Sequence, residues 1–242
     1  MRRKSGSRLL PVWMLLLGAA ALVLRKCLYT TCVDAKGLLL RGHPLGLALT
    51  VLTGAALILA AGLGWKRKNP EAEAGKLLGA FGNAAAGAGI LVTVLMGKPV
   101  MGNYLESAWY YLGLAAPVCL LLAGAAKAMG KRPFFLLHVV PCLFFLVHIV
   151  TRYQLWSSQP QMQDYVFALV GAAALMFFGF YTAALEADCG SPGMRLGMGL
   201  SAVYLCMAEL ARSSCPGLYL GGMLWVLTEL WGGKKNSEMI DQ

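Results

Sequence analysis

Charged side chains are scarce in this sequence: they make up 13% of 242 residues, while hydrophobic residues make up 58%. A soluble domain carries roughly a quarter charged residues and about half apolar ones, so most of this chain cannot form a water-facing surface. The apolar residues lie in blocks rather than at amphipathic spacing, and a block of about 18 or more can span a bilayer. The composition therefore excludes a soluble globular protein and predicts an integral membrane protein.

Known catalytic and ligand-binding signatures are also lacking. The sequence contains no phosphate-binding glycine-rich loop with a following Lys-Ser or Lys-Thr, no HExxH and no GxSxG. The seven cysteines show no CxxC redox or zinc spacing. A disulfide between Cys27 and Cys32 requires that their loop lies outside the cytoplasm, and spacing alone does not establish it. We therefore expect no bound metal and no cofactor.

Basic residues are almost twice as numerous as acidic ones, at 21 against 11, which gives a formal net charge of +10. Basic patches attract phosphate, so this excess raises the question of nucleic-acid binding. However, Lys and Arg occur in short runs at the ends of the apolar blocks, where they fix membrane topology. Since no polar segment is large enough for a nucleic-acid-binding fold, the expected partner is the lipid bilayer and not a nucleic acid.

Eight apolar blocks are present, and each is predicted to be a helix, because a lipid-exposed backbone must satisfy its own hydrogen bonds. They run over residues 9–24, 44–65, 77–97, 105–126, 134–151, 165–185, 194–210 and 217–231. The first and last blocks are shorter than the usual span of about 20 residues. If the first block lies along the membrane surface, seven spans remain. The predicted fold is thus an all-α bundle of about eight spans in a single integral membrane domain, residues 1–242, with no separate soluble domain.

The distribution of Lys and Arg predicts the orientation. With the N-terminus inside, alternate segments place 14 of the 21 basic residues on the cytoplasmic side, and cytoplasmic loops of membrane proteins carry such an excess. These residues include Lys76, Lys127, Lys131, Arg132 and Arg195. The first outer loop, 25–43, is the exception, with four basic residues of its own. Both termini are therefore predicted to be cytoplasmic.

Small residues form a regular pattern around the third block. Gly75, Gly79, Asn83 and Gly87 recur at four-residue spacing, which places them on one face of a helix. Such a face lets a neighbouring helix approach closely. We predict that it is a helix-packing face, and that Asn83 forms one hydrogen bond across the interface.

A polar cluster is predicted at the outer ends of the fifth to seventh blocks. Ionisable residues within membrane segments mark candidate functional sites, because charge in hydrocarbon is costly. If these helices pack together, five residues line an outward-facing vestibule that suits solute binding: His148, Arg152, Asp164, Glu209 and Arg212. The alternative interpretation is a set of ordinary interfacial charges.

The remaining intramembrane ionisable residues indicate structural roles. His138 and His148 lie ten residues apart, which is about 15 Å along a helix axis, so they cannot share one metal ion. Each is interpreted as a hydrogen-bonded packing histidine. Glu229, near the inner end of the last block, is interpreted as an interfacial residue.

Two segments are less generic than the rest. Residues 152–165 combine aromatic anchors with glutamines, in the sequence RYQLWSSQPQMQDY, and residues 33–44 read VDAKGLLLRGHP. Both resemble segments of an uncharacterised polytopic (multi-pass) family of bacterial membrane proteins of unknown function. The resemblance implies a bacterial cytoplasmic membrane as the location, and it implies no activity and no catalytic residues.

Three functional classes fit these features. The favoured class is a small-molecule carrier or solute-binding membrane protein, because eight spans with almost no exposed domain suit passage or a cavity. The alternative is a non-transporting accessory or sensory subunit that contacts a membrane-protein partner. An intramembrane enzyme is least favoured, since it needs convergent acid, base or metal ligands. A polar cavity at mid-depth would favour the carrier, and a packed bundle would favour the accessory subunit.

Overall fold

The structure, a computed structural model, describes residues 6–32, 43–66, 75–97, 104–157 and 165–231. Within these ranges the chain forms eight α-helices and no strand. They are α1 (Gly6–Thr31), α2 (Pro44–Trp65), α3 (Lys76–Met96), α4 (Tyr104–Ala128), α5 (Leu136–Trp156), α6 (Val166–Glu186), α7 (Pro192–Glu209) and α8 (Pro216–Leu230). The predicted all-α class is confirmed.

Six of the described helices, α1 to α6, are long and apolar enough to cross a membrane. Their outward side chains are apolar, as in α2, where Ile58 is 76% exposed and only four of 22 residues are buried. Exposed apolar surface on this scale needs a lipid environment. The chain is therefore an integral multi-pass membrane protein.

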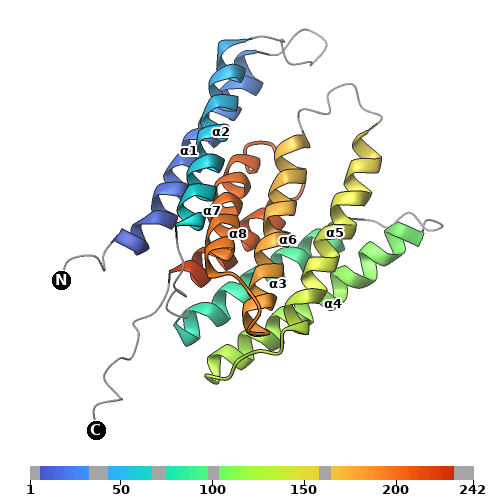
Figure 1. Ribbon diagram of the computed structural model, residues 1–242. Helices are drawn as coiled ribbons and strands as arrows, with labels where there is room; N and C mark the ends of the chain where they lie inside the picture. The colour runs from blue at the N-terminus through green and yellow to red at the C-terminus, as the bar shows by residue number, and fades with distance from the viewer. Residues whose placement is uncertain (1–5, 33–42, 67–74, 98–103, 158–164, 232–242) are drawn as a thin grey trace.

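The two remaining helices lie at the centre of the bundle. α7 packs against α1, α2, α6 and α8, and α8 packs against α3; Figure 1 shows α1 and α2 side by side along one flank, next to α7. Twelve of the 18 residues of α7 and ten of the 15 residues of α8 are buried. A helix that neighbouring helices cover does not need a fully apolar surface, which explains why α7 accommodates Arg195 and Glu209.

The first helix extends further than the sequence predicts. The apolar block ends at residue 24, because Arg25 and Lys26 resemble an interfacial stop, but α1 continues to Thr31. Arg25 is 2% exposed and lies inside the helix, where an acidic partner described below neutralises it. Cys27 is exposed on α1 and Cys32 is buried just after it, and both are free thiols.

Small residues of α3 face two different helices. On the α8 side, a Cβ atom on Gly82 would overlap Thr228, and one on Gly221 of α8 would lie 2.5 Å from the carbonyl oxygen of Ala85. On the α4 side, a Cβ on Gly87 would lie 3.3 Å from the carbonyl oxygen of Pro117. The backbones therefore approach closely on both sides, as small residues permit in membranes.

The four residues of the predicted packing face do not occupy equivalent positions. Gly79, Asn83 and Gly87 are buried in α3, whereas Gly75 precedes the helix as its N-cap residue. Asn83 is fully buried and hydrogen-bonds across to α8 and α5, as described below. The buried face of α3 thus contains both small residues that allow close packing and a polar residue, Asn83, that hydrogen-bonds to neighbouring helices.

Replacing Gly221 with valine should destabilise the bundle, because the added side chain meets the backbone of α3 at Ala85. Overpacking of this kind typically costs about 1–3 kcal/mol. Thermal unfolding of the purified protein in detergent measures the change. The matched control is Gly54→Val on α2, where nothing lies within 4 Å of an added Cβ. Equal stability of the two variants would contradict the close α3–α8 approach.

Candidate functional site

Charged side chains gather where the N-terminal ends of α3, α5 and α7 meet the C-terminal ends of α4, α6 and α8. We call this the basic end of the bundle. Neighbouring helices run in alternating directions, so residues far apart in the sequence meet here. The participants are Lys76, Lys127, Lys131, Arg132, Glu186, Asp188, Arg195 and Glu229.

Glu229 of α8 forms the floor of this cluster and is 4% exposed. Its Oε1 accepts hydrogen bonds from Lys127 Nζ at 2.5 Å and from Asn83 Nδ2 at 3.2 Å. Its Oε2 accepts a hydrogen bond from Arg195 Nη2 at 2.9 Å. A buried carboxylate is tolerated only when opposite charges and hydrogen bonds compensate its desolvation, and here three helices supply them.

His138 of α5 links this floor to a second carboxylate. Its Nδ1 lies 2.7 Å from Glu186 Oε2, and its Nε2 lies 3.3 Å from Asn83 Oδ1. Asn83 uses its amide nitrogen toward Glu229, which leaves its oxygen to face the histidine; this orientation follows from the hydrogen-bond network. The imidazole ring, fully buried, stacks on Trp225 with a centroid distance of 5.9 Å.

Both ring nitrogens of His138 therefore face hydrogen-bond acceptors. Lys127 Nζ lies 3.8 Å from Glu186 Oε1 and so joins the two carboxylates. The result is one connected network across α3, α4, α5, α6, α7 and α8.

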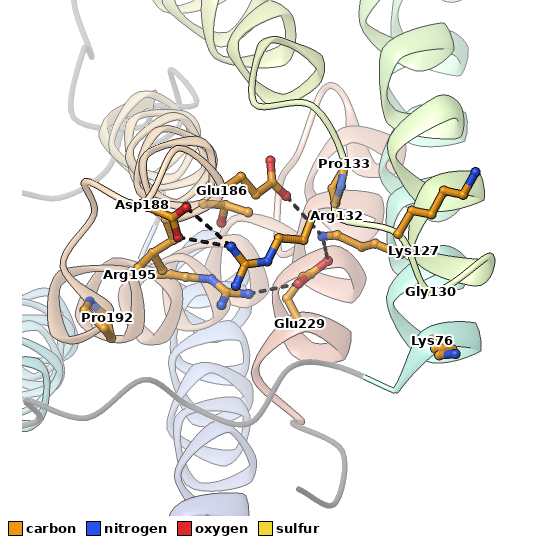
Figure 2. Close-up of a pocket in the computed structure, with 13 residues that line it drawn as sticks. Lys76, Lys127, Gly130, Arg132, Pro133, Glu186, Asp188, Pro192, Arg195 and Glu229 are labelled. Atoms are coloured by element: carbon orange, nitrogen blue, oxygen red, sulfur yellow. Dashed lines mark hydrogen bonds and ion pairs between the residues drawn. The ribbon is translucent and has the colours of Figure 1, made fainter. Parts of the chain in front are cut away.

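Above this network lies a pocket of about 390 Å³ (Figure 2). Its wall contains five cations and three carboxylates, completed by Gly130, Pro133, Thr182, Leu185 and Pro192. At the rim, Arg132 pairs with Asp188 at 3.1 Å, and both side chains are largely exposed. The charged lining makes the basic end able to hold a small polar solute.

Gly130 positions one of the cations at this pocket. It lies in the turn between α4 and α5 with a φ of 72°, a conformation that favours glycine. A Cβ atom there would lie 2.6 Å from Lys76 Nζ, so the lysine side chain of α3 rests directly against the turn. Among the described residues, the side chains of Lys76 and Lys131 form no hydrogen bond and no ion pair.

The residues predicted to form the outer cluster lie at the opposite end, and the first pair meets at Trp109. Trp109 Nε1 donates a hydrogen bond to His148 Nδ1 at 3.0 Å, and the two rings stack. The Arg152 guanidinium lies over the Trp109 ring, 5.8 Å from its centroid, and 3.8 Å from Cys215 Sγ. His148 is buried and accepts this hydrogen bond, as a packing histidine does.

The second pair meets at α1. Glu209 Oε2 lies 2.5 Å from Arg25 Nη1, which also donates to the carbonyl oxygen of Ala208 at 3.1 Å. Arg25 and Arg212 both lie over the ring of Tyr29. Asp164 lies outside the described residues. The structure therefore places the four described members in two groups, one around Trp109 and one around Arg25.

The ion pairs of the basic end were not predicted from the sequence. Glu229, interpreted as an interfacial residue, is buried among three partners, and His138, interpreted as a packing histidine, also contacts Glu186. One signal was present: the topology count assigns Lys76, Lys127 and Arg195 to the same side of the membrane. The acidic residues at the same end are Glu186, which pairs with Lys127, and Glu229, which pairs with Lys127 and Arg195.

No family model, curated protein sequence or solved structure matches the chain. The resemblance noted for residues 33–44 and 152–165 therefore identifies no family. Among the described residues, no group of three or more His, Cys, Asp or Glu side chains is placed to hold a metal ion. The class that fold and composition define is an integral, helical, multi-pass membrane protein.

Proposed function

We propose that this membrane protein binds a small solute in the pocket at its basic end, as a carrier or as a solute-binding membrane protein. The observation that carries the proposal is the buried network under the pocket. Ionisable groups inside a membrane domain are costly and mark functional sites by default. Here Lys127, Arg195 and Glu229, on three different helices, are mostly buried at the floor of a cavity.

The proposal includes a topology. We propose that all eight helices belong to one membrane domain, residues 1–242, and that α7 and α8 cross the membrane between the α1–α2 pair and the helices α3 to α6. Both termini then lie in the cytoplasm, and the basic end faces the cytoplasm. The excess of Lys and Arg at this end supports that orientation. The proposed location is the cytoplasmic membrane of a bacterium, as the resemblance of the two segments implies.

The second candidate is a non-transporting accessory or sensory subunit, and the packing at mid-depth favours it. Large apolar side chains fill the middle of the bundle, among them Phe144, Phe178, Leu175 and Leu200, each fully buried. The pocket lies at the end of the bundle and not at mid-depth, where carriers place their sites.

A carrier also needs an entrance at the opposite end of the bundle. The proposed lining of that entrance consists of His148, Arg152, Asp164, Glu209 and Arg212.

Filling the pocket should abolish solute binding. Leu185 lines the pocket and is partly exposed, so Leu185→Trp adds bulk to the cavity. We expect at least one class of small metabolites to raise the melting temperature of the wild-type protein in nanodiscs, in a saturable way, by several degrees. Leu185→Trp should lose this shift, and Leu78→Trp, at an exposed position of α3 outside the pocket, should keep it.

A screen over cationic, neutral and anionic metabolites in which no saturable shift depends on Leu185 would overturn the proposal. A solute found in this way then separates the two candidates. In proteoliposomes, a carrier exchanges labelled solute across the membrane. A sensory or accessory subunit binds the same solute with no exchange.

A further inference from the structure

We propose that the solute carries an oxyanion, a carboxylate or phosphate group, which binds between Lys76, Lys131 and Arg132 at the mouth of the pocket, above Lys127 and Arg195. This inference rests on the proposed function, because it names the chemistry that the same pocket recognises. It follows from the positions of the charged side chains in the lining and from which of them have partners of opposite charge.

The carboxylates of the lining are already opposed by cations. Glu229 pairs with Lys127 and Arg195, and Asp188 pairs with Arg132. Glu186 lies 2.7 Å from His138 and 3.8 Å from Lys127. Each carboxylate of the pocket thus has a cation within ion-pair distance, and only Glu186 Oε1 among their buried oxygens accepts no hydrogen bond from the described residues.

The cations, in contrast, are in excess. The lining contains five Lys and Arg residues against three Asp and Glu residues, so the pocket has a formal surplus of two positive charges. Lys76 and Lys131 line the pocket, and neither has an acidic partner among the described residues. A cleft of one sign with low-dielectric walls concentrates solutes of the opposite sign. The surplus thus favours an anion.

The mouth also has suitable geometry for binding. The side chain of Lys76 lies directly against the α4–α5 turn, because Gly130 has no side chain that would displace it. Lys131 and Arg132 follow Gly130 in the sequence and belong to the same turn. Arg132 lies at the mouth with its side chain 70% exposed, and it directs only Nη1 toward Asp188. A guanidinium with spare donors suits the fork of a carboxylate or phosphate.

Oxyanions reach such a pocket from two sources. One is a water-soluble metabolite, and the other is the headgroup of an anionic lipid, because basic pockets on the cytoplasmic side of membrane proteins bind such headgroups. Both present the same chemistry to the lysines. The experiment therefore includes an arm for each source.

The test uses the full-length protein in nanodiscs of phosphatidylcholine at constant ionic strength. Inorganic phosphate and succinate are titrated, with choline and glucose as cationic and neutral comparisons, and binding is measured from the melting temperature and by calorimetry. The decisive variant is Lys76→Gln/Lys131→Gln, which changes two exposed residues. The control is Lys66→Gln, an exposed lysine at the end of α2 that does not line the pocket.

We expect phosphate or succinate to bind in a saturable way and the double variant to bind about tenfold more weakly, since two cations at contact distance contribute at least that much. Lys66→Gln should bind as the wild type does. In nanodiscs containing phosphatidylglycerol, a lipid source shows as a higher melting temperature that the double variant loses and that phosphate no longer increases. Either pattern supports the oxyanion.

Equal anion binding by the double variant and the wild type would overturn the inference. A shift caused by choline or glucose and lost in Leu185→Trp would also overturn it, while the proposed solute site would stand. If no compound and no lipid produced a shift that depends on Leu185, both the inference and the proposed function would fall. The two failures are therefore distinguishable.

Discussion

Replacing Arg25 with methionine should lower the free energy of unfolding by about 3–5 kcal/mol, because it leaves Glu209 as an uncompensated buried carboxylate. Both side chains are almost fully buried, and Arg25 also donates to the backbone of α7 at Ala208. The guanidinium further stacks on Phe167 of α6, with 4.7 Å between its carbon and the ring centroid. One residue thus joins α1, α6 and α7.

A double-mutant cycle in detergent measures this interaction. Replacing both charges, in Arg25→Met/Glu209→Gln, should recover most of the stability lost in either single variant, because no isolated charge remains. The control is Lys26→Met, the next residue of α1, which is exposed and should change stability by less than about 0.5 kcal/mol. Additive losses in the double variant would show that the pair does not act as a unit.

Replacing Glu229 with glutamine should produce the second large effect. The substitution retains a side-chain oxygen near Asn83 but leaves the charges of Lys127 and Arg195, both mostly buried, without the carboxylate that separates them. We expect a loss of about 3 kcal/mol of stability, as for other buried ion pairs deprived of one partner. Thermal unfolding in detergent measures it.

The matched control for Glu229 lies at the rim of the same pocket. Asp188→Asn removes a carboxylate whose pair with Arg132 is exposed, at 77% and 70% for the two side chains, and exposed pairs contribute about 0–1 kcal/mol. Asparagine also tolerates the positive φ of 58° at this position. If Glu229→Gln and Asp188→Asn were equally stable, the buried ion pairs of Glu229 would contribute no more to stability than the exposed pair at the rim.

The helix boundaries were predictable wherever the transition from apolar to polar residues is sharp. The block 44–65 coincides with α2, and the block 77–97 differs from α3 by one residue at each end. The rule failed at α1, where Arg25 and Lys26 interrupt the apolar run. Sequence proximity does not reveal that the neutralising carboxylate, Glu209, lies 184 residues away.

The basic end was predictable in part, for a related reason. Topology assigned Lys76, Lys127 and Arg195 to one side of the membrane, because that assignment depends only on alternation along the chain. Their contact with Glu229 depends on which helices are neighbours in the bundle, and Lys127 and Glu229 are 102 residues apart. The side of the membrane on which a residue lies can be predicted from the order of the spans along the chain. The contacts between residues of different helices depend on how the helices pack.

The contact between Arg25 and Glu209 also has a consequence for the order of assembly in the cell. At roughly 5–20 residues per second, the ribosome adds the 184 residues between them in about 10–40 s. Until α7 emerges, Glu209 is not available to pair with Arg25. The contact between α1 and α7 can therefore form only long after α1 itself has been synthesised, so the docking of these two helices depends on α1 remaining accessible while α2 to α6 are made.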